Sequence, residues 1–144
     1  MSVYKAKGKV ADLESYCEDK DITGTVGIAH TRWATHGEPS SKNAHPHYSQ
    51  TQNLAMIHNG IIENYADIKA KLIKEGVEFH SDTDTEVLVQ LIEYIQTKKN
   101  LDLLHAVQVA MHIVVGAYAI AILDKSNPDT LIAASKQSQL VVGD

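Results

Sequence analysis

The chain has 144 residues, with 13 Lys and Arg against 18 Asp and Glu, a formal net charge of −5, eight His and one Cys. This length corresponds to about one domain, and 44% hydrophobic and 22% charged residues are typical of a soluble globular protein. The acidic balance argues against nucleic-acid binding, and a single cysteine forms no internal disulfide. The longest apolar run, 113–123, is shorter than the roughly 20 residues that span a bilayer, and the first residues lack a signal-peptide core. We therefore expect a cytoplasmic protein with no nucleic-acid or membrane partner.

Regular elements in the first half of the chain are short and stand on either side of a long polar loop. The loop, 33–48, is rich in Gly, Pro, Ser and Asn, and ordered loops of this length are usually functional. The apolar pattern predicts a helix over 10–18 with Val10, Leu13 and Cys17 on one face, a strand over 25–31, and a strand over 54–58. The last of these ends at Asn59–Gly60, a dipeptide that by itself favours a hairpin turn.

The second half predicts three helices and further strands. Asn64 is a candidate N-cap for a helix that carries Ile68, Leu72 and Ile73 and ends at Gly76. Thr83 and Glu86 form a capping box before a helix with a buried apolar face. The remaining expected elements, in chain order, are a strand over 77–79, a helix over 102–112, a central strand over 113–123, and strands over 130–134 and 139–142. Antiparallel hairpins with consecutive helices predict an α+β fold in which helices and a sheet share one core.

Three polar clusters follow apolar elements, where a scaffold presents functional side chains. Arg32 has the fork that holds a carboxylate by two hydrogen bonds, although a surface salt bridge is the commoner fate of an arginine. Asn59 and Gly60 offer a side-chain amide beside an open backbone N–H, a pair that can stabilise an oxyanion. Asp84 lies in the first turn of a helix and could anchor an ammonium group or simply cap the helix. Together these groups fit an α-amino acid with a side-chain carbonyl.

Other candidate sites have less support. The pair His45 and His47 lacks the spaced carboxylate or cysteine partners that a metal site requires, so we expect no metal. Cys17 shares a predicted helix face with apolar residues, which favours packing over a nucleophilic role. There is no Gly-rich phosphate loop, and we expect no cofactor.

The same polar clusters resemble a known family. The run 27–37, Gly-Ile-Ala-His-Thr-Arg-Trp-Ala-Thr-His-Gly, is similar to the glutamine-binding loop of the glutamine–fructose-6-phosphate aminotransferases, isomerising enzymes that make glucosamine 6-phosphate. Four further motifs follow in the family's order, at 43–47, 58–64, 81–87 and 116–120. The resemblance extends from about Gly8 to the end of the chain. Other class II glutamine amidotransferases share the Asn-Gly pair and an arginine but not typically the whole run.

The resemblance implies an N-terminal-nucleophile hydrolase fold, a four-layer αββα sandwich, and hydrolysis of L-glutamine to glutamate and ammonia. Ammonia would then pass to a separate sugar isomerase domain that converts fructose 6-phosphate. Carried over residue by residue, Arg32 would hold the glutamine carboxylate, and Asp84 would bind its ammonium. Asn59 and the Gly60 N–H would form the oxyanion hole, while the closing loop over glutamine would contain Trp33, Thr35 and His36.

The chain departs from the family in one respect that matters for activity. The family's nucleophile is an N-terminal cysteine whose own α-amine acts as the base. Neither Cys17 nor Ser2 stands in the corresponding strand, so residues 1–144 read as a partial glutaminase domain that lacks its opening segment and the isomerase domain. We expect such a chain to be inactive alone. The alternative is a non-catalytic module that binds glutamine or glutamate.

Overall fold

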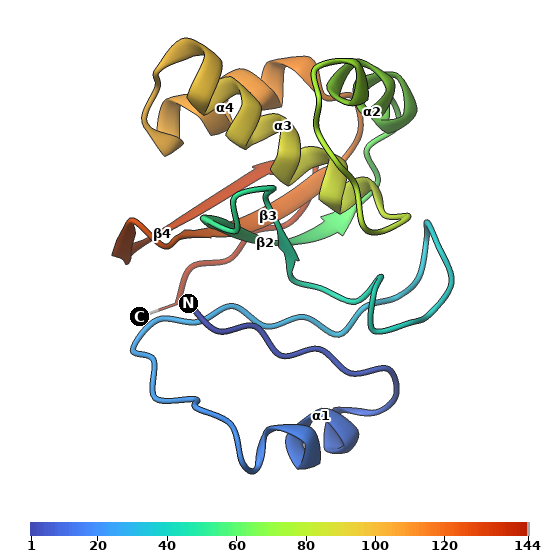
Figure 1. The fold of residues 1–144 in the computed structure, drawn as a ribbon, viewed down its shortest axis with the longest axis vertical. Helices are drawn as coiled ribbons and strands as arrows, with labels where there is room; N and C mark the ends of the chain where they lie inside the picture. The colour runs from blue at the N-terminus through green and yellow to red at the C-terminus, as the bar shows by residue number, and fades with distance from the viewer. Residues whose placement is uncertain (144) are drawn as a thin grey trace.

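The computed structural model describes residues 1–143 as an antiparallel sheet with helices packed against one face. Its strands are β1 (His47–Tyr48), β2 (Leu54–Gly60), β3 (Tyr118–Asp124) and β4 (Asn127–Lys136), and they lie side by side in chain order. Three helices, α2 (Tyr65–Lys74), α3 (Asp84–Lys99) and α4 (Leu103–Ile113), cover one face of the sheet (Figure 1). The expected α+β class is confirmed. No helix among residues 1–143 is long and apolar enough to cross a membrane.

The core lies between the sheet and these helices. Side chains alternate along β3, so Tyr118, Ile120 and Ile122 are buried against the helices while the residues between them are only partly covered. Helix α3 is central to the core, because its apolar residues from Val87 to Ile95 pack toward both the sheet and the neighbouring helices. The buried helix face expected over this segment is therefore confirmed. Packing of this face against the sheet holds the N-terminus of α3 beside the end of β2.

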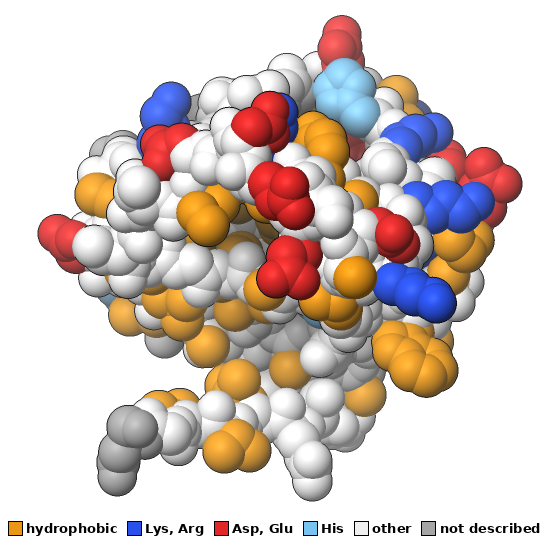
Figure 2. Space-filling view, turned by 90° about the horizontal axis from the view of Figure 1, so that it is seen from below, with side chains coloured by type: hydrophobic (Ala, Val, Ile, Leu, Met, Phe, Trp, Pro, Cys, Tyr) orange, Lys and Arg blue, Asp and Glu red, His pale blue; other side chains and the backbone are white. Residues whose placement is uncertain are grey.

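The opposite face of the sheet is covered differently. Here the chain before residue 47 runs past the sheet, and its helix α1 (Val10–Cys17) lies farthest from it (Figure 1). The helix expected over 10–18 forms, but it buries no residue, and Val10 is 66% exposed. Seen from this side, acidic side chains lie among exposed apolar ones (Figure 2). The predicted apolar face of Val10, Leu13 and Cys17 is thus not packed into the core.

The central strand expected over 113–123 begins only at Tyr118, because α4 continues to Ile113 and the chain then turns back toward the sheet. Three other expected strands are absent from residues 1–143. The segment 25–31 runs without ladder partners, and Val26 is exposed, because no neighbouring strand supplies backbone hydrogen bonds. In 77–79 side chains replace a neighbouring strand, since the Glu78 N–H donates to Gln50 and its carbonyl accepts from Gln90. The segment 139–142 is exposed and forms no strand either. These segments contain the apolar residues typical of strands, but a strand also requires a neighbouring strand with which to form hydrogen bonds.

Asn59 and Gly60 lie inside β2 and not in a hairpin turn. They pair with Ala119 and Tyr118 in the antiparallel ladder, so the turn favoured by the dipeptide alone is wrong. The Gly60 φ of +115° is one that side chains rarely adopt, and a Cβ there would lie 2.2 Å from the Ala117 carbonyl oxygen. Glycine is required at this position by the close approach of two backbones.

Candidate functional site

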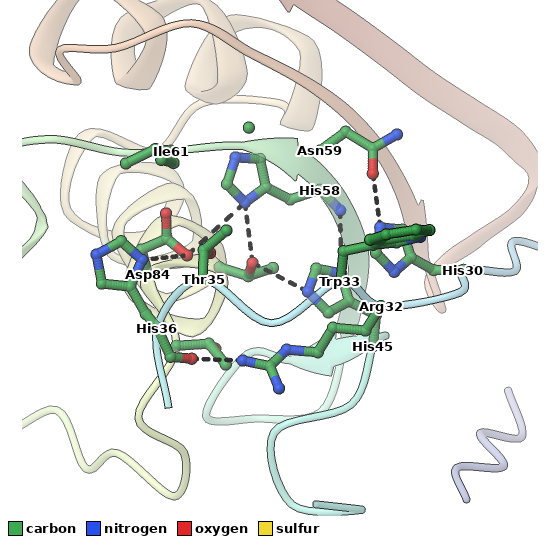
Figure 3. A pocket seen from close by; sticks show the side chains of 13 residues that line it. His30, Arg32, Trp33, Thr35, His36, His45, His58, Asn59, Ile61 and Asp84 are labelled. Atoms are coloured by element: carbon green, nitrogen blue, oxygen red, sulfur yellow. Dashed lines mark hydrogen bonds and ion pairs between the residues drawn. The ribbon is translucent and has the colours of Figure 1, made fainter. Parts of the chain in front are cut away.

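A cavity of about 380 Å³ opens where β2 ends beside the N-terminus of α3. It is lined by all seven residues that the sequence singled out, which come from the loop before β1, the end of β2 and the start of α3: Arg32, Trp33, Thr35, His36, Asn59, Gly60 and Asp84. Figure 3 shows Asp84 between His36 and His58, with a dashed line to each. The tertiary structure therefore brings together three clusters that are far apart in the sequence.

Asp84 is the negatively charged group of the cavity. It is the first residue of α3, whose N-cap Thr83 accepts a hydrogen bond from the Glu86 N–H. Only 3% of Asp84 is exposed, and its Oδ2 accepts a hydrogen bond of 2.8 Å from the Ile62 N–H. Its Oδ1 lies 3.8 Å from His36 Nδ1 and 4.0 Å from His58 Nδ1. The helix N-terminus and this backbone donor both favour a carboxylate here.

The register of the sheet leaves the Gly60 N–H free of ladder bonds. The Ile61 N–H donates to the Ala117 carbonyl, and N–H groups point alternately to the two sides of a strand, so the Gly60 N–H points away from β3. On that side β1 has already ended, because its two residues pair only with Met56 and Ala55. The His58 N–H points to the same side of β2 and donates to His45 Nδ1 at 3.2 Å. Of these two N–H groups, the one on Gly60 faces the cavity end.

Asn59 completes this donor pair. Its Oδ1 lies 2.7 Å from His30 Nε2, and the dashed line in Figure 3 joins the two side chains. When His30 donates this hydrogen bond, the Asn59 amide oxygen is occupied and its NH₂ group is the part that can donate to a ligand. Asn59 and Gly60 thus present two donors at one end of the cavity.

The Arg32 guanidinium closes the loop that forms the outer wall. Its terminal nitrogens donate to the carbonyl oxygens of His36, Gly37 and Glu38. Arg32 therefore makes hydrogen bonds in place of the commoner surface salt bridge, and it holds the backbone of 36–38 against the cavity. Trp33, on the same loop, is 89% exposed. The long loop predicted over 33–48 is confirmed up to the short strand β1.

Buried histidines surround the floor of the cavity. Burial, reinforced by the neighbouring His30, lowers the pKa of His45 from 6.5 to about 2. Burial and the positive charge of Lys5 lower the pKa of His47 to about 3. Burial also lowers the pKa of His58, against the opposing effect of Asp84. These imidazoles are neutral at ordinary pH. His45 and His58 form a polar but uncharged part of the lining, and His47 contacts the lining residue Thr83.

Several lining residues were not assigned a role from the sequence. His45, considered only as a metal ligand, stacks on His30 with ring centroids 4.0 Å apart and hydrogen-bonds to Thr85. Thr85 and His58 also line the cavity and are joined by a hydrogen bond of 2.9 Å. No local pattern signals these contacts, because they join residues 15 to 40 positions apart. Within residues 1–143, no group of three or more His, Cys, Asp or Glu side chains is placed to hold a metal ion.

The cavity lining contains neither cysteine nor serine. Its hydroxyl groups belong to Thr35, Thr83 and Thr85, and the last two are already engaged in hydrogen bonds with histidines. Cys17 lines a different cavity, on the other face of the sheet. The arrangement can therefore bind a zwitterion and stabilise an oxyanion, but its own side chains include no activated nucleophile.

Comparison with known proteins identifies the family of the chain. Residues 30–138 match the family model of the glutamine amidotransferase domain. The chain is 66% identical over 143 residues to the glutamine–fructose-6-phosphate aminotransferase (isomerizing) of Bacteroides thetaiotaomicron and 48% identical to that of Caldanaerobacter subterraneus. Each match covers 99% of this chain and 23% of the relative's length.

Solved structures show the same relationship at the level of the fold. The glutamine phosphoribosylpyrophosphate amidotransferase of B. subtilis, solved with ADP and GMP, matches with a TM-score of 0.59 and 31% identity. The match covers 74% of this chain and 22% of that one. A second structure, of the allosteric regulatory enzyme of purine biosynthesis, gives a TM-score of 0.57 and 32% identity.

Proposed function

The chain belongs to the glutamine amidotransferase domain family, and we propose that its cavity binds L-glutamine and stabilises the oxyanion formed when the side-chain amide is hydrolysed. The observation that carries this proposal is the meeting of Arg32, Asp84 and the Asn59–Gly60 pair in one cavity. These groups complement the carboxylate, the ammonium and the amide carbonyl of a single ligand.

The two ends of the amino acid have distinct partners. Asp84 accepts hydrogen bonds from the ligand ammonium group, because its buried Oδ1 faces the cavity and has no lysine or arginine partner among residues 1–143. Arg32 takes the carboxylate by exchanging one or more of its carbonyl partners at 36–38, which couples binding to the position of the loop. Trp33, Thr35 and His36 then close over glutamine as parts of that loop.

The reacting carbonyl lies against Asn59 and Gly60. As a nucleophile attacks, negative charge develops on the amide oxygen, and the Asn59 NH₂ group and the Gly60 N–H stabilise it. Both donors are held before the ligand arrives, since His30 fixes the Asn59 amide and the β2–β3 register fixes the Gly60 backbone. Preorganised donors avoid the reorganisation that water would require.

The nucleophile comes from outside these 144 residues. A cysteine with a free α-amine at the N-terminus of the functional enzyme attacks the amide carbon, and its amine takes the thiol proton and passes it to the departing nitrogen. Ammonia leaves as a γ-glutamyl thioester forms, and water then hydrolyses the thioester to glutamate and the free thiol. Its absence from the cavity lining makes the chain inactive alone, since loss of a nucleophile has reduced turnover by about a million-fold in another hydrolase.

The chain spans about a quarter of the length of the relatives it matches, and its partners follow from that. Ammonia released at the cavity passes to a sugar isomerase domain, which uses it to convert fructose 6-phosphate to glucosamine 6-phosphate. A second sheet belongs on the open face of the described one, giving the four-layer αββα sandwich. The half-covered Ile57 and Ala121 and the exposed Leu131 on that face support this arrangement.

Glutamate release from glutamine tests the proposal. The chain is compared with a version extended by an N-terminal segment that begins at a free cysteine, and with the same extension beginning at alanine. We expect release only from the version with the cysteine. Release from the chain as it stands would overturn the account of the nucleophile. Failure of all three to bind glutamine by calorimetry would overturn the assignment of the cavity.

A further inference from the structure

A line of hydrogen bonds beneath the cavity begins at the backbone of His58. The His58 N–H donates to His45 Nδ1 at 3.2 Å. A backbone amide can only donate, so this ring nitrogen of His45 carries no proton. His45 is therefore neutral, with its proton on Nε2, which lies 3.3 Å from Thr85 Oγ1. His45 is the donor in that hydrogen bond and Thr85 the acceptor.

The line continues from Thr85 to the ring of His58. Thr85 has one hydroxyl proton, and its oxygen lies 2.9 Å from His58 Nδ1. Among residues 1–143 the Thr85 oxygen has only two hydrogen-bond partners, His45 Nε2 and His58 Nδ1. Because His45 donates, only His58 Nδ1 is left to accept the hydroxyl proton. The proton of His58 is then on Nε2, which is buried and has no hydrogen-bond partner within residues 1–143. A buried unpaired donor is unfavourable, but a proton on Nδ1 would instead leave the buried Thr85 hydroxyl without an acceptor. The contacts at Nδ1 therefore favour this tautomer.

The selected tautomer changes what Asp84 faces. His58 Nδ1 lies 4.0 Å from Asp84 Oδ1, and the dashed line in Figure 3 marks this approach. A proton on Nδ1 of a charged His58 would neutralise the carboxylate in a poorly solvated site, where such an ion pair is strong. An Nδ1 that already accepts from Thr85 offers no such proton. The Asp84 charge stays available.

We propose that His45 and Thr85 are positioning residues that hold His58 as the neutral Nε2–H tautomer, and that this keeps Asp84 free for the ammonium group of an amino acid ligand. The second half of this statement rests on the proposed function; the first half concerns the protein alone. The titratable groups that face His58 are Asp84 from α3, Tyr118 from β3, whose ring centroid lies 6.4 Å from that of His58, and three histidines from the loop before β1: His30, His36 and His45. The hydrogen bonds from His45 through Thr85 to His58 form a relay. Burial of His58 acts in the same direction as this relay, because burial disfavours the charged ring.

Side-chain ¹⁵N NMR of the 144-residue chain tests the tautomer directly. Bare and protonated ring nitrogens have well-separated shifts, and the His58 signals are assigned by their loss in His58→Gln. We expect bare Nδ1 and protonated Nε2 at about pH 7, and we expect the ring to become charged only below its ordinary pKa. A protonated Nδ1 at about pH 7, in either the charged or the alternative neutral form, would overturn the proposal.

Two substitutions at one position test the relay. Thr85→Val removes the hydroxyl and Thr85→Ser keeps it, while Thr130→Val makes the same change on β4, away from the cavity. We expect Thr85→Val to put a proton on His58 Nδ1 in a part of the molecules that grows as pH falls, and Thr85→Ser to restore the original tautomer. An unchanged His58 spectrum in Thr85→Val would overturn the relay, and a variant that fails to fold leaves the decision to the unsubstituted chain.

Glutamine affinity tests the consequence for Asp84. In calorimetry we expect Thr85→Val to bind glutamine about tenfold more weakly than Thr85→Ser at pH 6, with a smaller difference at pH 8. Equal ratios at both pH values would overturn the role assigned to the Asp84 charge. Failure of the unsubstituted chain to bind glutamine would count against the proposed function, whereas the NMR result would still decide the tautomer.

Discussion

The Asn59 side-chain oxygen lies 2.7 Å from His30 Nε2, and this contact decides which part of the amide is free for a ligand. His30 itself is held by stacking on His45, with ring planes 12° apart. The orientation of a donor in the candidate oxyanion hole thus depends on a residue 29 positions earlier in the chain.

This relationship predicts unequal effects for two substitutions in the cysteine-extended chain. Asn59→Ala removes a donor to the oxyanion, and we expect glutamate release to fall by about 10²–10³-fold. His30→Ala leaves the amide present but unheld, and we expect a smaller loss of about tenfold. Steady-state assays at saturating glutamine measure both. His112→Ala, at an exposed position of α4 away from the cavity, is the matched control. An equal loss in all three variants would refute the prediction.

The substitution Asp84→Asn removes the negative charge at this position but keeps the size and shape of the side chain. The amide can still accept from the Ile62 N–H, so we expect the fold to persist while glutamine affinity falls by about ten- to a hundredfold, the size of a lost charged hydrogen bond. A glutamine analogue without the α-ammonium group provides the control ligand. Its affinity should not fall in the variant, and calorimetry measures both ligands. Equal weakening of the two ligands would show that Asp84 does not contact the ammonium.

Gly60→Ala and Gly76→Ala have similar backbone strain but different surroundings. Gly76 has a φ of +88° with open space where a Cβ would stand, whereas a Cβ on Gly60 would meet the Ala117 carbonyl oxygen. We expect Gly76→Ala to reduce the free energy of unfolding by about 1 kcal/mol and Gly60→Ala by more than about 3 kcal/mol. Urea denaturation followed by circular dichroism gives both values. Similar losses would mean that the β2–β3 contact yields easily.

The buried histidines make the fold sensitive to acid. The folded-state pKa values of His45 and His47, about 2 and about 3, lie below the unfolded value of 6.5. Between these limits the unfolded chain binds more protons, so stability is fully present above pH 6.5 and falls as pH decreases below it. At pH 5.5 the two residues together remove about 3 kcal/mol of unfolding free energy.

Urea midpoints measured from pH 7.5 to pH 5.5 check this prediction. His47→Gln should flatten the pH dependence by about half, because one of the two groups no longer titrates. His105→Gln, at an exposed helix start, serves as a control that should leave the slope in place. A pH-independent midpoint would show that His45 and His47 are accessible to protons in the folded chain.

Elements whose sequence pattern lies within one continuous stretch of the chain were predicted correctly. The helix that begins after Thr83 was predicted because the N-cap and the apolar spacing lie within one stretch, and the structure confirms it as α3. Asn64 was also correctly placed before α2, but its side chain does not cap that helix; it bonds to the backbone of Ile113 and Val115. A local pattern located the residue, and a contact about 50 positions away determined its role.

The strands show more clearly what local patterns cannot predict. The segment 25–31 is as apolar as many strands, yet it remains unpaired within residues 1–143, whereas the chain from Tyr118 to Asp124 becomes the strand β3 between two partners. Alternation of side chains is a property of the segment itself, but a ladder of hydrogen bonds belongs to two segments. The same reason explains why Asn59–Gly60 forms the end of a strand where the dipeptide suggested a turn.

The sequence by itself determined the residue types for an amino acid ligand, because charge, a forked guanidinium and an Asn-Gly pair are properties of the side chains and their neighbours. It also determined the family, through motifs that stand in order along the chain. Only the tertiary structure decided that Arg32, Asn59 and Asp84 share one cavity, that the Gly60 N–H is left outside the ladder, and that His45 reaches His58 through Thr85. These relationships depend on strand register and on helix packing across some 40 residues, and nearest-neighbour patterns do not encode them.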